Sequence, residues 1–366
     1  MHLVHVIARL NDGGPARVLA ELGRELAGHG HRVTILSGAC DASEPDLTEL
    51  VRANGVAVET VPGLGRRVAP TDDLRAFRHV LARLRELRPD VVHTHTAKAG
   101  ILGRVASRLL GLPVVHTYHG HVLHGYFPRV INRAIQGLER VVAGDCHHHA
   151  LTPGQVRELY LRFGVGRGSH WHGLPVPVAP VAPRRADWHA QLVPGAPVVG
   201  FLGRLVAIKD GDLYLDVLAR LAQRGPVQGV VCGDGVLREP LEARAHALGL
   251  RVRFTGFVPA AEAFGCFDLL LVTSRNEGQP LAVIEAGSAG VPAVAPPVGG
   301  LRDLIRWGGC VGAPRTAEAL AAACGALLAD AGARERAARR ARRLAARLAP
   351  GVLVGAYERM YAAVRG

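Results

Sequence analysis

The chain has 366 residues, of which 49% are apolar and 20% are charged. This length exceeds one compact core and suits two domains of ordinary size, and the apolar content excludes a disordered chain. The formal charge is +13, yet Lys98 and Lys209 are the only lysines among the 44 basic residues. We interpret the arginine excess as the bias of a GC-rich genome, so the charge alone predicts no partner.

The six cysteines are scattered and contain no C-x-x-C pair. This spacing argues against a disulfide framework and a thiolate zinc site, and it favours a reducing cytoplasm. The first residues lack the pattern of a secretory signal, and no run of about 18 apolar residues predicts a membrane span.

The first half alternates short apolar runs with helical patterns. Strands are expected at 3–8, 32–37, 91–95 and 114–118. Apolar residues recur at helical spacing after residue 14, and again at 72–88 and 99–110. Strands separated by segments of helix length predict a parallel sheet covered on both faces.

The second half repeats this alternation after a proline-rich segment, 173–197, which we expect to join two domains. The expected strands are 198–202, 227–232, 252–254, 269–273 and 293–295, and the expected helices are 212–224 and 236–248. A further segment, 333–348, carries seven arginines and is interpreted as a solvated surface helix rather than a membrane-facing or nucleic-acid-facing one.

Ligands of open α/β sheets bind where the strands end, so candidate site residues are expected in the turns that follow strands. Gly13 and Gly14 lie between the first strand and a helix, where backbone N–H groups and the helix dipole suit a phosphate. The G-x-G-x-x-G fingerprint of dinucleotide binding is absent here.

Histidines gather after two first-half strands, at positions 93, 95, 116, 119, 121 and 124. A metal would need carboxylate or cysteine partners that the neighbouring sequence lacks, so we expect strand-end imidazoles lining a polar cleft. The run His147-His148-His149 receives no function.

Two turns of the second half carry charged side chains. Arg204 and Lys209 bracket a turn after a strand, and such a pair can clamp a pyrophosphate. Glu277 lies in the turn after residue 273, and Glu285 falls on the second turn of the following apolar helix. A carboxylate in such surroundings needs hydrogen-bond donors, which sugar and ribose hydroxyls or a nearby arginine can supply.

These motifs occur in an order that resembles the retaining glycosyltransferases with the GT-B fold, specifically the group 1 transferases of glycosyltransferase family 4. They are Gly13-Gly14, 89–95, 116–120, Gly203-Arg204-Leu205 with Lys209, Gly233-Asp234-Gly235, Gly256-Phe257-Val258, the E-x7-E motif from Glu277 to Glu285, and Val298-Gly299-Gly300.

The resemblance implies that Arg204 and Lys209 bind the donor diphosphate and stabilise the leaving group. It implies that Glu277 and His119 contact the donor sugar and that Glu285 binds the ribose, so that His119, Arg204, Lys209 and Glu277 form the catalytic set. The further donor-binding positions that it implies are Gly13, Gly14, Phe257, Val258, Gly278, Gln279, Pro280, Leu281 and Ala282.

The implied architecture has two doubly wound, Rossmann-like domains facing a central cleft, at 1–180 and 181–348, with a terminal helix, 349–366, that crosses back to the first domain. The implied reaction transfers a sugar from a nucleotide sugar, with a UDP-sugar favoured, to a hydroxyl acceptor with retention. It needs no cofactor and no metal, because the two cations stabilise the charge of the departing diphosphate.

Three positions depart from the family pattern. Asp210 follows Lys209 and is expected to weaken the phosphate clamp, Gln279 stands where a small residue is common, and His172-Gly173 replaces the usual junction turn. The alternatives are a GT-B sugar-nucleotide epimerase, a phosphorylase and a non-catalytic nucleotide-sugar-binding protein.

The expected partners are a nucleotide-sugar donor and a glycan, lipid-linked or small-molecule acceptor, and no nucleic acid, since a recognition motif and a stacking platform are lacking. The implied pathway is cell-envelope, capsule or exopolysaccharide assembly. Contact with anionic lipid at the cytoplasmic face of a membrane is a candidate role for a basic first-domain surface made by Arg66, Arg67, Arg75, Arg78 and Arg104. Lys98 is a candidate for binding the acceptor or a phosphate, and a surface lysine without such a role is an equal alternative.

Overall fold

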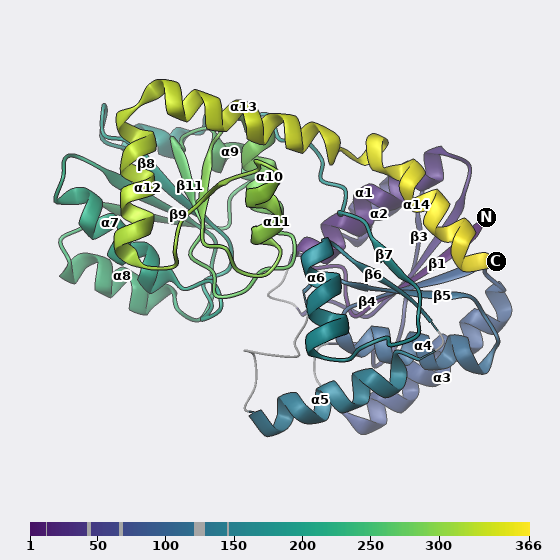
Figure 1. Ribbon diagram of the computed structural model, residues 1–366. Helices are drawn as coiled ribbons and strands as arrows, with labels where there is room; N and C mark the ends of the chain where they lie inside the picture. The colour runs from purple at the N-terminus through teal and green to yellow at the C-terminus, as the bar shows by residue number, and fades with distance from the viewer. Residues whose placement is uncertain (12, 42–44, 66–68, 121–128, 145) are drawn as a thin grey trace. The chain divides into compact units, whose positions relative to one another are not determined.

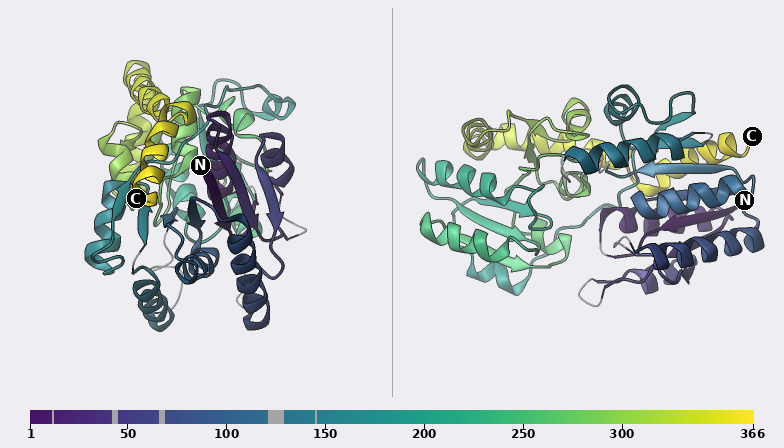
Figure 2. Two further views of the ribbon diagram at one scale, coloured as in Figure 1. Left: turned by 90° about the vertical axis from the view of Figure 1, so that its right-hand side faces the viewer. Right: turned by 90° about the horizontal axis from the view of Figure 1, so that it is seen from below.

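A computed structural model describes residues 1–11, 13–41, 45–65, 69–120, 129–144 and 146–366. The chain forms two compact units, and each has its own parallel sheet. The first unit comprises Met1–Pro177 together with Pro350–Gly366, and the second comprises Val178–Ala349. Both sheets carry helices on their two faces (Figures 1 and 2).

The first sheet has seven parallel strands in the order β3-β2-β1-β4-β5-β6-β7, so its order reverses between β1 and β4. The four strands that the sequence predicts form its centre, and three further strands were not predicted. In chain order the strands are β1 (His2–Ile7), β2 (Arg32–Ser37), β3 (Ala57–Thr60), β4 (Val91–His95), β5 (Val114–Tyr118), β6 (His147–Ala150) and β7 (Trp171–Gly173).

Helices of the first unit bury apolar stripes on both faces of this sheet. One core joins β1 and β2 to α1 and the last helix, and the other joins β1 and β4 to α3 and α4. The helices are α1 (Gly14–Gly28), α2 (Thr48–Ala53), α3 (Pro70–Leu87), α4 (Ala97–Leu109), α5 (Arg129–Val142), α6 (Pro153–Arg157) with a π-helical turn at Glu158–Arg162, and α14 (Pro350–Arg365).

Helix α14 belongs to the first unit although the second unit precedes it in the chain. Tyr357, Met360 and Tyr361 are buried in the core that also holds Leu19 and Leu22 of α1. Burial of such side chains stabilises the helix at this place. The predicted return of the terminal helix to the first domain is therefore confirmed.

The second sheet has six parallel strands in the order β10-β9-β8-β11-β12-β13, and its order reverses between β8 and β11. The strands are β8 (Val198–Leu202), β9 (Gln228–Cys232), β10 (Val252–Gly256), β11 (Leu269–Leu271), β12 (Ala293–Ala295) and β13 (Val311–Gly312). The helices are α7 (Gly211–Ala222), α8 (Arg238–Ala247), α9 (Ala260–Phe264), α10 (Leu281–Ala289), α11 (Leu301–Arg306), α12 (Ala317–Ala329) and α13 (Ala331–Arg347).

Most of the proline-rich segment belongs to the second unit, because the boundary between the units follows Pro177. The Arg184 N–H donates a hydrogen bond of 2.8 Å to the carbonyl of Ala261. The Trp188 indole N–H donates one of 3.2 Å to Glu262. The segment thus connects the two units only near Pro177, and beyond it the chain packs against α9 of the second unit.

The arginine-rich segment forms helix α13, which packs against α10. Four of its alanines and Leu344 are buried, whereas six of its seven arginines are exposed, which confirms the predicted surface helix. In the part of the chain that the structure describes, no helix combines the length and apolar character that crossing a membrane requires.

Candidate active site

The carboxyl edge of the second sheet holds the charged turns, at the point where strand order reverses. The turn after β8 carries Lys209, and the turn after β11 carries Glu277. Two hydrogen bonds tie these turns together: the Thr273 hydroxyl donates to the carbonyl of Lys209 at 2.9 Å, and the Arg275 N–H donates to the carbonyl of Ile208 at 2.8 Å. These two hydrogen bonds therefore fix the turns against each other before any ligand binds.

Lys209 and Glu277 form an ion pair across these turns, between Nζ and Oε1. The Ser274 hydroxyl donates a hydrogen bond of 2.6 Å to the same carboxylate oxygen. Both charged side chains are half-buried. The structure thus brings together two of the predicted catalytic residues and adds Ser274 as a third polar group.

Arg204 lies on the same turn as Lys209 but differs from it in its surroundings. Its side chain is exposed, and within the described residues it makes no hydrogen bond or ion pair. A guanidinium in this condition has its full set of N–H donors available for an anion.

Asp210, which the sequence led us to expect would weaken the phosphate clamp, has its carboxylate paired with two other arginines. Its buried carboxylate pairs with Arg315 and, at 3.1 Å, with Nε of Arg275. Two guanidinium groups therefore compensate its charge locally. Asp210 itself has a left-handed backbone, φ 53°, and stands directly before α7.

The glycine turns of the second unit are explained by close backbone contacts. A Cβ atom on Gly233 would lie 2.0 Å from the carbonyl oxygen of Gly203, and one on Gly299 would lie 2.1 Å from that of Glu277. The Gly300 N–H also donates to the Glu277 carbonyl at 2.9 Å. Only glycine permits such an approach, so these residues hold the charged turns in place.

The remaining residues of the E-x7-E segment occupy the start of helix α10. Pro280 precedes the helix, and Leu281 and Ala282 are its first two residues. The helix has no side-chain cap, so no capping side chain occupies its N-terminus, as an anion site requires. Gln279 and Glu285 are buried, and Glu285 lies on the second turn as predicted.

Phe257 and Val258 follow β10 at the same carboxyl edge. The Phe257 ring is 63% exposed, while Val258 is half-buried. An exposed aromatic ring at the carboxyl edge of a sheet is suited to stacking on a planar group.

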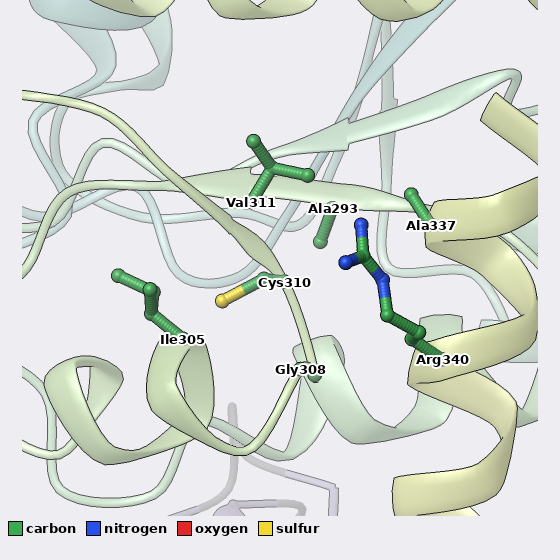
Figure 3. A pocket seen from close by; sticks show the side chains of 8 residues that line it. Ala293, Ile305, Gly308, Cys310, Val311, Ala337 and Arg340 are labelled. Atoms are coloured by element: carbon green, nitrogen blue, oxygen red, sulfur yellow. The ribbon is translucent and has the colours of Figure 1, made fainter. Parts of the chain in front are cut away.

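A small cavity of about 150 Å³ lies elsewhere in the second unit, between β12, β13 and α13 (Figure 3). Its lining includes Ile305, Cys310, Val311 and Arg340 and none of the predicted site residues. Burial raises the pKa of the Cys310 thiol to about 12, so this sulfur stays protonated and unreactive.

Gly13 and Gly14 lie at the carboxyl edge of the first sheet, where Gly13 caps helix α1 and Gly14 begins it. No side chain caps this helix either. On the other side of the reversal point, Thr96 directly precedes α4 and has φ 61°, an unusual value for a β-branched residue.

His119, just after β5, begins a line of three imidazoles that runs into the sheet. Its Nε2 shares a hydrogen bond of 2.9 Å with Nδ1 of His95, and Nε2 of His95 shares one of 3.0 Å with Nδ1 of His5. Burial lowers the pKa of His119 and of His5 to about 3, so both rings are neutral at physiological pH. His5 and His95 were not predicted to support His119.

The expectation that the first-half histidines line a polar cleft is wrong for His93 and His116. Both side chains are buried within the sheet, where burial holds the pKa of each well below its usual value. The His93 nitrogens bond to Tyr361 and Thr117, and Nδ1 of His116 bonds to Thr94. His121 and His124 lie outside the described residues.

His5, His93 and His95 place one ring nitrogen each within 4.8 Å of one another. A neutral imidazole has a single lone pair for a metal. Both nitrogens of His93 are engaged, at 2.8 Å and 2.5 Å, so a metal there would have to displace a hydrogen bond of His93.

Two other predictions concern basic residues of the first unit. Lys98 forms an ion pair with Asp73, which favours a structural role. Arg104 does not belong to a basic surface, because it is buried and paired with Glu139. Arg75 and Arg78 are exposed on α3, and Arg66 and Arg67 lie outside the described residues.

Comparison with known protein families covers both units. Residues 12–172 match the family model described as Glycosyltransferase Family 4, and residues 196–330 match the one described as Glycosyl transferases group 1. The chain is 30% identical to a D-inositol 3-phosphate glycosyltransferase of Xylanimonas cellulosilytica, over 89% of this chain and 86% of the relative.

Two further similarities concern an enzyme and a solved structure. The chain is 26% identical to a UDP-Gal:alpha-D-GlcNAc-diphosphoundecaprenol alpha-1,3-galactosyltransferase of Escherichia coli, over 67% of each chain. The structure of HepE from Anabaena in complex with UDP and glucose superposes with a TM-score of 0.83 at 21% identity, covering 99% of this chain and 100% of the other. The last similarity confirms the predicted fold.

Proposed function

The chain belongs to the group 1 transferases of glycosyltransferase family 4, and from this premise we propose that it transfers a sugar from a UDP-sugar to a hydroxyl acceptor with retention of the anomeric configuration. The observation that carries the proposal is the ion pair of Lys209 with Glu277 beside the exposed Arg204, at the point where the second sheet reverses its order.

In the proposed reaction Arg204 and Lys209 bind the diphosphate of the donor. Negative charge grows on the diphosphate as its bond to the sugar breaks, and two fixed cations stabilise that charge. This arrangement supplies the electrostatic assistance that a metal would otherwise give, so we propose metal-independent transfer without a cofactor.

Glu277 is proposed to accept hydrogen bonds from sugar hydroxyls. Its carboxylate is held by Lys209 and by Ser274, so its position is fixed before the donor arrives. The free N–H groups of Leu281 and Ala282 are proposed to meet the phosphate or sugar, and buried Glu285 is proposed to meet the ribose.

Three residues of the first unit complete the proposal. Gly13 and Gly14 offer a phosphate the start of α1, which no side chain caps. His119 offers one ring nitrogen to the donor sugar while the other bonds to His95. Phe257 is proposed to stack on the base because its ring is exposed at the edge of the second sheet.

The acceptor is proposed to be a glycan or a lipid-linked sugar of the cell envelope. The Escherichia coli relative, whose name includes a diphosphoundecaprenol-linked sugar, supports this class of acceptor. The six free cysteines support action in a reducing cytoplasm.

The test is incubation of the protein with UDP-, GDP- and ADP-sugars while nucleotide release and thermal stabilisation are measured. We expect release and stabilisation with a UDP-sugar and undiminished turnover in the presence of a chelator. Binding without release would identify a non-catalytic binding protein, and release abolished by the chelator would contradict metal independence. Proton NMR of the anomeric centre of the product decides between retention and inversion.

A further inference from the structure

Helix α5 buries its acidic residue and exposes part of its apolar side. Glu139, the single acidic residue of the helix, is buried. The Arg104 guanidinium donates to both of its carboxylate oxygens, at 2.7 Å and 3.1 Å, and the Tyr118 hydroxyl donates to Oε1 at 2.6 Å. This buried triad fixes the rotation of α5 about its own axis.

The outward side of α5 carries large apolar side chains. Val130 is 78% exposed and Val141 is 72% exposed, and Ile131 and Leu138 are each 48% exposed. With about 3.6 residues per turn, these four side chains fall within a sector of about 100°. They therefore form one continuous stripe, which we call the α5 stripe. Helix α5 itself lies at the periphery of the first unit (Figure 1).

Two exposed arginines of the same helix, Arg133 and Arg140, follow one border of the α5 stripe. Because Glu139 is buried, no acidic side chain of α5 faces solvent. An apolar stripe flanked by cations is the pattern of helices that lie in a membrane interface, where apolar side chains enter the acyl boundary and cations meet anionic head groups.

We propose that the α5 stripe binds the surface of a bilayer that contains anionic phospholipid. Exposing four large apolar side chains in water is costly unless something covers them. Pairing of two copies through the stripe would bring Arg133 and Arg140 of both chains together without an exposed acid on the helix to compensate them. An anionic bilayer covers the apolar side chains with its acyl boundary and compensates the arginines with its head groups.

This surface takes the place of the predicted basic one. Arg104, expected to face lipid, instead sets the orientation of the helix that does so. The binding proposal does not depend on the donor site. It deepens the proposed function in one respect, because a membrane surface is where a lipid-linked acceptor resides.

The test is sedimentation of the full chain with vesicles of phosphatidylcholine, with and without phosphatidylglycerol. We expect binding only to the anionic vesicles, weakened by added salt. Leu138→Glu and Val141→Glu should each reduce the bound fraction at least tenfold, since a carboxylate in the stripe loses apolar contact and meets lipid of like charge. Arg133→Gln and Arg140→Gln should each weaken binding about fivefold.

Val352→Glu is the matched control, because Val352 is 63% exposed on α14 and lies outside the stripe. Thermal unfolding and stabilisation by a UDP-sugar should be unchanged in the Arg133, Leu138, Val141 and Val352 variants, since these side chains are exposed. Arg140→Gln also removes a hydrogen bond of 2.6 Å from Nε to the carbonyl of Phe163, so its unfolding is measured beside its binding. Failure of the wild-type chain to bind anionic vesicles would overturn the proposal. So would stripe variants that bind normally, or ultracentrifugation showing that the stripe variants separate a dimer into monomers.

Discussion

The hydroxyl of Tyr361 and Nδ1 of His93 lie 2.8 Å apart, although 268 residues separate them in the chain. The direction of this hydrogen bond follows from a chain of partners that ends at the carbonyl of Leu174. Nε2–H of His149 donates to that carbonyl at 2.7 Å, so Nδ1 of His149 accepts from the Thr117 hydroxyl, also at 2.7 Å.

The Thr117 oxygen then accepts from Nε2–H of His93. This leaves Nδ1 of His93 with a lone pair, which the Tyr361 hydroxyl satisfies. One carbonyl thus fixes the tautomers of two buried histidines and links the terminal helix to β4, β5 and β6.

Tyr361→Phe should destabilise the fold by about 1–3 kcal/mol, because the buried His93 lone pair loses its donor while the ring volume is retained. The measurement is urea unfolding followed by circular dichroism. Tyr160→Phe is the control, since Tyr160 is exposed on the π-helical turn and should tolerate loss of its hydroxyl. Equal stability of the two variants would show that the hydroxyl of Tyr361 contributes nothing.

The buried histidines should make the protein less stable in mild acid. Burial lowers the pKa of His5 and His119 to about 3 and of His148 and His149 to about 4, so these rings stay neutral in the folded chain. The unfolded chain takes up protons below about pH 6.5. Stability is therefore complete above that pH and decreases as the pH falls through it.

We expect the free energy of unfolding to fall by at least about 1 kcal/mol between about pH 7.5 and about pH 5.5. Urea unfolding at each pH measures it. His246→Gln, at an exposed position of α8, should leave this slope unaltered. A flat profile over this interval would mean that the folded chain protonates its histidines as readily as the unfolded chain.

The centres of both sheets could be predicted because each of their strands contains a short run of valine, leucine or isoleucine between segments of helical spacing. β3, β6 and β7 escaped prediction for different reasons. β3 is short and half exposed, β6 consists of His147, His148, His149 and Ala150, and β7 is Trp171-His172-Gly173. Hydropathy cannot identify a strand such as β6, whose side chains are histidines satisfied by hydrogen bonds to β5, β7 and nearby backbone carbonyls.

The pairing of Lys209 with Glu277 was within reach of sequence reasoning, because both follow strands that meet at one edge of a sheet. The partners of Asp210 and Arg104 were not. Arg315 lies 105 residues after Asp210, and Glu139 lies 35 residues after Arg104. A buried ion pair depends on which helices pack together, and no local pattern around either arginine records that.

Arg104→Met should cost about 3–5 kcal/mol, because it leaves the Glu139 carboxylate buried without its cation. Replacing both residues, as in Arg104→Met with Glu139→Leu, should recover most of that loss, since no uncompensated charge then remains. Chemical unfolding of the single and double variants measures the difference. A double variant as unstable as the single one would show that packing of Arg104, rather than charge, is what the fold requires.

The same pair predicts acid sensitivity at lower pH than the histidines do. Burial alone would raise the pKa of Glu139, but the guanidinium and hydrogen bonds of Arg104 lower it below its ordinary 4.5. The pair therefore stabilises the fold fully above pH 4.5 and loses this contribution as the pH falls toward the lower, folded pKa. The double variant should lack this part of the profile.

Lys209→Ala should reduce kcat/KM for a UDP-sugar about 100-fold or more, because one of the two cations proposed to face the developing charge is lost. The chain offers a matched control in its only other lysine. Lys98→Ala removes an ion pair with Asp73 in the first unit and should leave turnover unchanged. Nucleotide release measures both, and wild-type turnover by Lys209→Ala would remove this residue from the proposed site.

Gly299→Ala should disturb the candidate site through the backbone alone. The added Cβ would lie 2.1 Å from the carbonyl oxygen of Glu277, so the turn that presents this carboxylate to Lys209 must shift. Gly249→Ala is the control, because Gly249 also has a positive φ, +64°, but a methyl group added there would meet no atom within 4 Å. Both variants carry a backbone strain of about 1–2 kcal/mol.

Only Gly299→Ala carries the clash as well, so the difference between the variants isolates it. We expect both to fold and to lose stability in urea, and only Gly299→Ala to lose nucleotide release. Equal release by the two variants would mean that the position of the Glu277 turn does not limit the reaction, which would separate this carboxylate from the chemistry proposed for it.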